Sequence, residues 1–162
     1  MDLLNNDIIA YILSKSCTQT IGRCLNVNKK WKQIIETYGW MFELNFSNLQ
    51  INNESMKYFK NAKIINLKNC SKITNIGLRY SKQVRSIDLT RCDKITDDGL
   101  KYLKEVHTID LTYCNKITND GLKYLKEVHT INLDHCNKIT DDGLKYLKGV
   151  SKKKISFLGS YY

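Results

Sequence analysis

Proline is absent from the 162 residues, and this absence argues against long flexible linkers. The chain also lacks an apolar run near the roughly 18 residues that a membrane-spanning helix needs. The first residues, MDLLNNDIIAYILSKS, contain early acids and no basic segment before the apolar stretch, which is not typical of a secretory signal peptide. We therefore expect an intracellular protein, cytoplasmic or nuclear.

No C-x-x-C pair occurs among the six cysteines, which argues against a zinc site. An even number of cysteines could form disulfides in a secreted protein, but nothing in the sequence indicates secretion. Four of the cysteines, Cys70, Cys92, Cys114 and Cys136, instead recur every 22 residues. We expect them to be reduced and buried, and we expect neither a metal nor another cofactor.

What the sequence does contain is a long repeat. Residues 89–110 read LTRCDKITDDGLKYLKEVHTID, and residues 111–132 read LTYCNKITNDGLKYLKEVHTIN, with only four differences. Aligned on the cysteines, each unit follows the pattern V-x-x-I-x-L-x-x-C-x-x-I-T-x-x-G-L-x-x-L. The pattern is regular enough to predict the structure of one unit and to extend it to the others.

One unit predicts a strand, a loop and a short helix. The stretch HTIDLTY alternates polar and apolar residues, so Ile109 and Leu111 should face the core from a short strand. Thr118 can cap the start of a helix in which Leu122 and Leu125 face inward. A glycine recurs in the first turn of each predicted helix, where it costs about 1 kcal/mol relative to alanine. The four glycines, Gly77, Gly99, Gly121 and Gly143, therefore predict a close approach between helix and strand.

A single unit cannot bury its apolar face alone, so the units must stack. We expect an α/β solenoid with parallel strands on its concave face and short helices on its convex face. The spacing L-x-x-L-x-L-x-x-C resembles the leucine-rich repeat, in particular its cysteine-containing subclass. The expected array covers residues 43–162, with a degenerate first repeat at 43–62, regular repeats at about 63–150 and a cap at 151–162. Residues 153–162 should form a final strand within that cap.

The polar positions of the concave strands are expected to bind a target protein. The leading candidates are Asp88, Arg91, Asp110, Tyr113, Asn132, Asp134 and His135, and their neighbours are Ser86, Thr90, Thr108, Thr112 and Thr130. Many of these should be ordinary solvated strand residues, because a few residues usually dominate an interface. Arg91, Tyr113 and His135 occupy one equivalent position in repeats that are otherwise nearly identical, so they are the first candidates for mutation.

Residue combinations typical of an active site are missing from the sequence. It has no nucleophile–base–orienter set and no phosphate-binding glycine loop, since the glycines of the repeat pattern come one per repeat. His107 and His129 occupy the same position in consecutive repeats, so duplication explains their pairing. We expect that the protein is not an enzyme.

Residues 1–42 do not follow the repeat, and their apolar spacing predicts three short helices in a small domain. The sequence LLNNDIIAYILS…TIGRCLNVNKKWKQIIE resembles an F-box, with Asn5 where that family usually has proline. The matching positions are Leu4, Asp7, Ile8, Ile9, Ile12, Leu13, Ile21, Leu25, Val27 and Trp31. The resemblance implies that a linker subunit of a cullin-type (SCF) ubiquitin ligase binds at Leu4, Ile8, Ile9, Ile12, Val27 and Trp31. The alternative for some of them, Ile9 and Trp31 especially, is the core between the helices.

The two resemblances together imply a substrate-recognition adaptor, which brings a target protein to the ligase and does no chemistry itself. One alternative is a protein-binding scaffold or decoy without ligase recruitment, which Asn5 favours. Another is a nucleic-acid binder, since the net charge is +10, although the excess lies at residues 57–85 and Lys152–Lys154 and not in a continuous stripe. The isoleucine-, asparagine- and lysine-rich sequence is similar to F-box/leucine-rich-repeat proteins of large amoeba-infecting DNA viruses. That likeness implies a host cell as the site of action.

Overall fold

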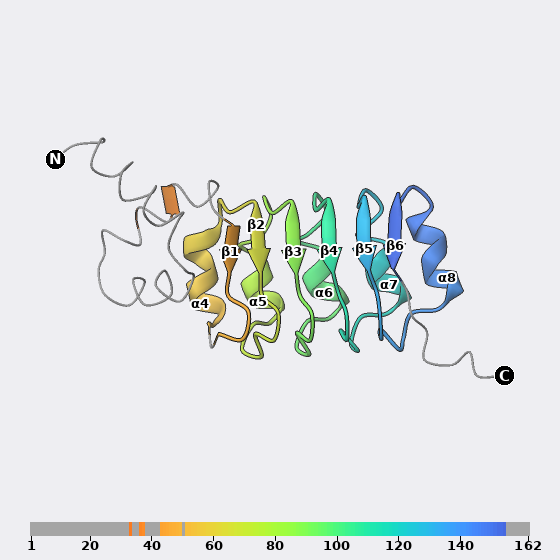
Figure 1. The fold of residues 1–162 in the computed structure, drawn as a ribbon, viewed down its shortest axis with the longest axis horizontal. Coiled ribbons are helices and arrows are strands. Elements are labelled where there is room, and N and C mark those ends of the chain that lie inside the picture. Colours follow the sequence, from red (N-terminus) through yellow and green to blue (C-terminus); the bar gives the residue numbers. More distant parts are fainter. Residues whose placement is uncertain (1–32, 34–35, 38–42, 50, 155–162) are drawn as a thin grey trace.

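One sheet of six short parallel strands runs along the array in the computed structural model, which describes residues 33, 36, 37, 43–49 and 51–154. Each strand pairs with the next one in the chain, as Figure 1 shows. The strands are β1 (Glu43–Asn45), β2 (Ile64–Asn66), β3 (Ser86–Asp88), β4 (Thr108–Asp110), β5 (Thr130–Asn132) and β6 (Lys152–Lys154). The predicted strand around Ile109 is thus β4.

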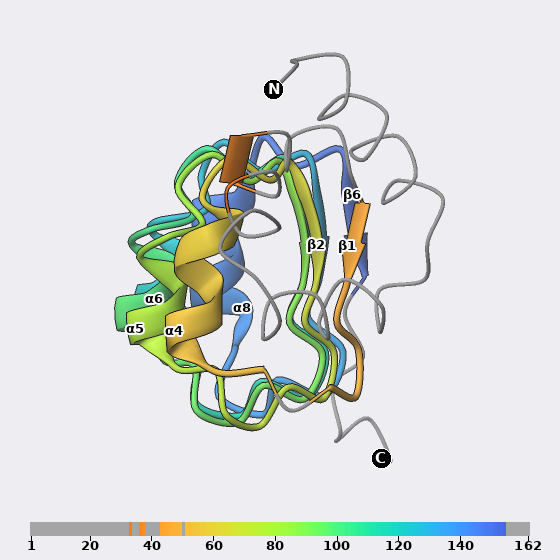
Figure 2. The same cartoon turned by 90° about the vertical axis from the view of Figure 1, so that its left-hand side faces the viewer.

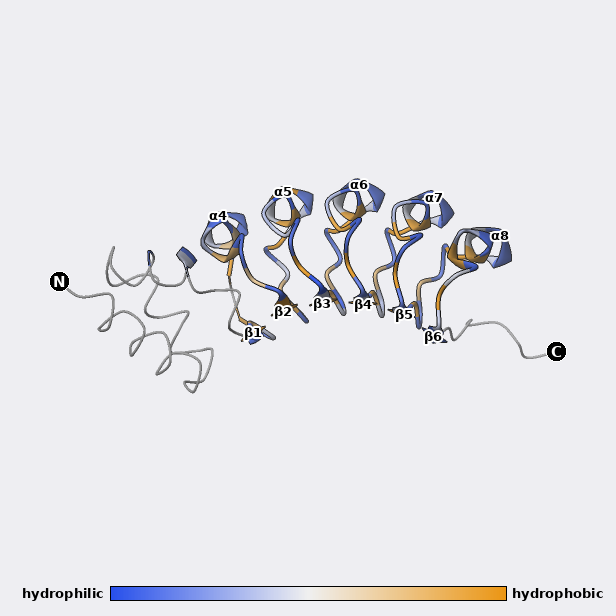
Figure 3. Cartoon of the chain, turned by 90° about the horizontal axis from the view of Figure 1, so that it is seen from above, coloured by the Kyte–Doolittle hydropathy of each residue, from blue (hydrophilic) through white to orange (hydrophobic). Residues whose placement is uncertain are grey.

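Short helices cover one side of this sheet, and one follows each of the strands β1 to β5. They are α4 (Asn53–Met56), followed directly by the 3-10 helix η2 (Lys57–Phe59), then α5 (Asn75–Leu78), α6 (Asp97–Leu100), α7 (Asn119–Leu122) and α8 (Asp141–Leu144), which continues into η3 (Lys145–Leu147). Figure 2 shows the helices and the strands as two separate layers, and Figure 3 shows the helices on the outer side of an arc and the strands on its inner side. The described part of the array is therefore the predicted α/β solenoid. None of its helices is long and apolar enough to cross a membrane.

The predicted helical domain at residues 1–42 lies almost wholly outside the described residues. This holds for every predicted linker-binding position, that is Leu4, Ile8, Ile9, Ile12, Val27 and Trp31. Glu36 is described, and it contacts the first repeat. Its backbone carbonyl accepts a hydrogen bond from the Asn61 side chain at 2.7 Å, and its carboxylate pairs with Lys60.

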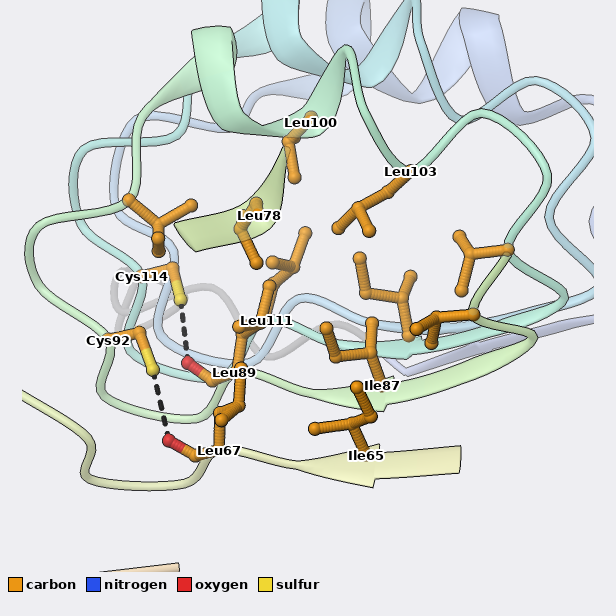
Figure 4. Close-up of a cluster of buried hydrophobic side chains, with 14 of the residues drawn as sticks. Ile65, Leu67, Leu78, Ile87, Leu89, Cys92, Leu100, Leu103, Leu111 and Cys114 are labelled. Atoms are coloured by element: carbon orange, nitrogen blue, oxygen red, sulfur yellow. Dashed lines mark hydrogen bonds between the residues drawn. The ribbon is translucent and has the colours of Figure 1, made fainter. Parts of the chain in front are cut away.

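The core forms because each of the strands β1 to β5 directs its middle residue and the residue just beyond its end toward the helices. In β3 these are Ile87 and Leu89, which are 2% and 0% exposed. Figure 4 shows them packed between the equivalent residues of the neighbouring strands and the leucines of the helix side, among them Leu78, Leu100 and Leu103. Burying one such side chain contributes about 1.5–3 kcal/mol. The repeated apolar positions of the sequence thus build a single continuous core.

The repeated cysteines are buried and reduced, as predicted. Each thiol donates a hydrogen bond to the backbone carbonyl of a residue in the preceding repeat. Figure 4 shows two of these bonds, from Cys92 to Leu67 at 3.2 Å and from Cys114 to Leu89 at 3.1 Å. Burial raises the pKa of Cys92 to about 12, so its thiol stays protonated and unreactive. These cysteines therefore fasten consecutive loops to one another.

The prediction that the glycines let helix and strand approach was wrong. An added Cβ at Gly77 would lie 2.7 Å from the Asn53 side-chain oxygen, and one at Gly99 would lie 2.6 Å from that of Asn75. Asn53 and Asn75 are the first residues of α4 and α5, so the close approach is between one helix and the next. The helices approach closely because a polar contact joins them, and a side chain at the glycine position would displace this contact.

That contact joins the first residue of one helix to the threonine that caps the next, and we term it the Asx–Thr clamp. Between α6 and α7, Asp97 Oδ1 accepts a hydrogen bond from the Thr118 backbone N–H at 2.8 Å, and the Thr118 hydroxyl donates to Asp97 Oδ2 at 2.7 Å. Between α7 and α8, the Asn119 amide instead donates to the Thr140 hydroxyl at 2.8 Å. Thr118 also accepts from Asp120 N–H at 3.2 Å, which confirms it as a helix cap.

The last described strand differs from the other five. In β6, Lys153 pairs with Ile131 of β5, so lysine stands where the inner strands have a buried apolar residue. All three residues of β6 are exposed. The final strand of the predicted cap thus begins at Lys152, one residue before the predicted start, and residues 155–162 lie outside the described part of the chain.

Candidate protein-binding face

The concave side of the sheet is hollowed into a groove of about 400 Å³. It is lined by Glu43 and by all three residues of each strand from β2 to β6. Six predicted target-binding or neighbouring positions are among them: Ser86, Asp88, Thr108, Asp110, Thr130 and Asn132. Ile64 adds an apolar side chain that is 41% exposed, and Lys152–Lys154 close one end of the groove with positive charge. The groove thus carries charges of both signs, while most of its accessible surface is apolar.

The last residue of each inner strand also has a structural role, because its side chain holds the turn that follows. Asp88 Oδ1 accepts a hydrogen bond from the Thr90 backbone N–H at 2.8 Å, and Asp110 Oδ1 accepts one from Thr112 N–H at 2.8 Å. Asn132 Oδ1 accepts from Asp134 N–H at 3.1 Å in the same way. This two-residue reach is the turn geometry that aspartate and asparagine favour. These predicted target-binding residues therefore both line the groove and shape its edge.

Asp110 is the centre of a hydrogen-bond network across three repeats. Besides Thr112, it accepts a bond from the Thr90 hydroxyl at 3.2 Å and one from the Asn132 amide at 3.0 Å. Asn132 in β5 thus donates a hydrogen bond to the Asp110 carboxylate in β4. An aspartate at position 132 would instead repel that carboxylate. Asp110 thus has a like-charged neighbour, Asp88, on one side and a hydrogen-bond donor, Asn132, on the other.

Five residues, each three positions beyond the end of its strand, share a left-handed backbone, and we term them the strand-exit ladder. They are Asn48, Asn69, Arg91, Tyr113 and His135, with φ between 58° and 62°. Each of the first four backbone N–H groups donates to a carbonyl of the next repeat, for example Arg91 to Thr112 and Tyr113 to Asp134, both at 2.9 Å. This conformation suits asparagine and costs other residues about 1–2 kcal/mol. The ladder therefore stores strain at Arg91, Tyr113 and His135.

The side chains of Arg91, Tyr113 and His135 stack on one another. The Tyr113 and His135 rings are parallel within 8°, with centroids 4.3 Å apart. The Arg91 guanidinium carbon lies 4.9 Å from the centroid of the Tyr113 ring. Contacts of these kinds contribute about 0.5–1.5 kcal/mol each, so they offset much of the backbone strain. The three residues that vary at one repeat position thus form one rigid group.

Asp134 differs from the other predicted target-binding residues because it is only 6% exposed. Its Oδ2 pairs with Lys154 Nζ at 2.8 Å, and this contact raises the pKa of the Lys154 ammonium. Thr90 is buried to a similar degree. The Asp134–Lys154 ion pair fastens β6 to the loop after β5, and no spacing in the sequence indicates this contact.

His107 and His129 lie just before β4 and β5, apart from the strand-exit ladder. Their rings meet edge to face, with centroids 5.0 Å apart. Across residues 43–49 and 51–154, no group of three or more histidine, cysteine or acidic side chains is arranged to hold a metal ion.

Comparisons with known proteins agree with this architecture. A leucine-rich-repeat model matches residues 81–104, 106–126 and 128–148, so leucine-rich repeats are present in the chain. Yeast Rad7, in its crystal structure with Elc1, has a similar fold, with a TM-score of 0.55 and 14% identity over 72% of this chain and 37% of Rad7. The internalin InlF of Listeria monocytogenes gives a TM-score of 0.54 and 13% identity over 75% of this chain and 36% of the internalin.

At these identities the likeness shows the fold alone. The chain spans little more than a third of the length of either protein. No curated protein is significantly similar to it in sequence.

Proposed function

We propose that the chain is the substrate-recognition adaptor of a cullin-type ubiquitin ligase. Residues 1–42 bind the linker subunit, and the concave face with the strand-exit ladder binds the target protein. The adaptor contributes proximity and carries out no reaction of its own, so we also propose that it is not an enzyme. If the gene is viral, as the composition suggests, the ligase and the target belong to the host.

The observation that carries the proposal is the order of the two parts along the chain. An F-box-like sequence, ending in V-x-x-x-W at Val27 and Trp31, directly precedes a leucine-rich-repeat array. The array offers a groove and a rigid aromatic and cationic group, which are the features that hot spots of interfaces favour. Rad7, which shares the fold, was crystallised with the partner Elc1. This supports a two-component assembly.

The second candidate is a scaffold or decoy that binds a target without recruiting a ligase. Asn5 favours it, because the proline usual at this F-box position fixes the backbone at the start of the first helix, and asparagine does not. The two candidates share the target-binding face and differ only in whether the linker subunit binds. Capture of that subunit therefore separates them.

The test is affinity capture from a eukaryotic cell lysate with the full chain as bait, followed by mass spectrometry. The bait variants are Leu4→Ala and Trp31→Ala, with Lys104→Gln on the convex side as a control that changes a surface charge far from both predicted interfaces. Wild type and Lys104→Gln should retain linker and cullin subunits, and the other two variants should retain at least about tenfold less. Circular dichroism establishes that each variant is folded. If the folded wild-type chain retains no linker subunit, the adaptor proposal fails and the scaffold remains.

A further inference from the structure

The loops that follow the strands carry an excess of positive charge. Each of the loops 69–72, 91–94, 113–116 and 135–138 ends in a lysine. These are Lys72, Lys94, Lys116 and Lys138, and all four are exposed. Arg91 adds a fifth cation, and Asp93 is the one acid within the four loops. We term the five cations the positive edge.

These cations differ from the lysines that directly follow the α-helices in having no acidic partner. Lys101 pairs with Asp98, and Lys123 pairs with Asp120, each within its own repeat. In the part of the chain that the structure describes, none of the five cations of the positive edge forms an ion pair. The charge of this edge is therefore open to an external anion.

Arg91 is the best-positioned cation of the edge, because its position is fixed. Its backbone is held in the left-handed conformation, with φ of 58°, and its guanidinium lies against the Tyr113 ring. Stacking occupies a face of the planar guanidinium and leaves the N–H donors at its rim available. Since less side-chain entropy is lost on binding, a fixed arginine binds an anion more tightly than a free one.

Resting on the target-binding half of the proposed function, we propose that the positive edge binds an acidic peptide segment of the target. Arg91 forms a two-bond contact with one carboxylate or phosphorylated side chain, which is the geometry that guanidinium favours. The lysine of each neighbouring loop attracts further acidic residues as the segment crosses the repeats. An isolated surface ion pair contributes little, but one anchored arginine within a row of like charges gives both affinity and direction.

A peptide fits this edge better than a single-stranded nucleic acid does. Nucleic-acid binders of that kind stack bases on aromatic rings, but Arg91 comes from the preceding repeat and His135 from the following one, so both faces of Tyr113 are covered. Asp88 and Asp110 line the adjoining groove, where they would repel a regular row of phosphates. A peptide can place an acid at the edge and uncharged or basic residues over the groove.

The test measures fluorescence anisotropy of three labelled probes of equal length with the purified full chain. The probes are a peptide alternating glutamate with glycine, its phosphoserine counterpart, and a glutamine–glycine peptide as the neutral control. A single-stranded oligonucleotide of matched charge is a fourth probe. The protein variants are Arg91→Gln and Arg91→Asn, the latter matching the backbone preference of the ladder. Lys104→Gln again serves as control, since it is exposed and forms no ion pair within the described residues.

We expect an anionic peptide to bind at least about tenfold more tightly than the neutral one. Both Arg91 variants should lose about tenfold in that affinity, and Lys104→Gln less than twofold. Stronger binding of the phosphoserine probe or of the glutamate probe would identify which anion the site prefers. The inference is overturned if Arg91→Gln and Lys104→Gln weaken binding equally, if the neutral peptide binds as well, or if the oligonucleotide binds more tightly than either anionic peptide. Linker capture is a separate measurement, so its failure would leave this result intact.

Discussion

Replacing Gly121 with alanine should destabilise the array, although the same change stabilises an ordinary helix. In an exposed helix interior, glycine to alanine contributes about 1 kcal/mol of stability. Here the new Cβ would overlap Asp97 Oδ1 and lie 3.0 Å from Asp97 Cγ, so the Asp97 side chain must move. The two hydrogen bonds of its Asx–Thr clamp with Thr118 would then be lost.

The magnitude follows from these opposing effects. A hydrogen bond to a charged group contributes about 1.5–3 kcal/mol, and the lower value applies because both partners are partly exposed. Losing two such bonds costs about 3 kcal/mol, and the gain in helix propensity returns about 1 kcal/mol. We therefore expect Gly121→Ala to lower the free energy of unfolding by about 2 kcal/mol, measured by urea denaturation of the full chain.

Two controls make this prediction specific to the clamp. An added Cβ at Gly149 meets nothing within 4 Å, so Gly149→Ala should change stability by no more than about 0.5 kcal/mol. In a chain that already carries Asp97→Ala, the clash with the carboxylate is gone. The second change, Gly121→Ala, should then be neutral or stabilising by up to about 1 kcal/mol. The reasoning is refuted if Gly121→Ala alone leaves the chain as stable as wild type, or if its cost is the same in both backgrounds.

Three further predictions concern buried groups. Ser81 is 1% exposed, and its hydroxyl has no hydrogen-bond partner. Ser81→Ala should therefore raise the free energy of unfolding by about 1 kcal/mol in urea denaturation, and a loss of stability would contradict this. Folding raises the pKa of Cys92 from 9.0 to about 12, so the stability that this thiol contributes is complete below pH 9 and is lost as the pH rises toward 12. Between pH 8 and about 10, the free energy of unfolding should therefore fall less for Cys92→Ala than for wild type, and equal losses would refute this. With Cys17 and Cys24 replaced by serine, the remaining thiols should react with a disulfide reagent about 100-fold more slowly in the folded chain than in urea, and similar rates would show that they are accessible.

The period of the sequence was sufficient to predict the layers of the fold. Ile109 and Leu111 are buried, and Thr118 caps its helix, because these roles depend on contacts within one unit or on its simple stacking. The role of the glycines depends on which residue of the neighbouring helix comes opposite. This depends on how far each helix is shifted relative to the next one, which a periodic sequence does not determine. The prediction therefore placed each glycine against a strand, where the structure has the preceding helix.

The candidate site was predictable in its position but not in its conformation. The equivalence of Arg91, Tyr113 and His135 is visible in the repeat, but a left-handed backbone is uncommon for arginine and tyrosine. A signal was nonetheless present, since Asn48 and Asn69 occupy the same position in the first two repeats, and asparagine favours this conformation. The three side chains stack because they leave the backbone at equivalent positions, with the same conformation, in consecutive repeats.

The threonine hydroxyl of the Asx–Thr clamp can both donate and accept, and this has a consequence for how the array evolves. Thr118 donates to an aspartate, whereas Thr140 accepts from an asparagine, so either threonine is compatible with either partner. A deletion of 22 residues, such as 111–132, would bring α6 against α8 through surfaces that already match. Whole units can thus be gained or lost by recombination between nearly identical segments. Each such event changes which side chains stand next to one another at the strand exits while the joints between units remain satisfied.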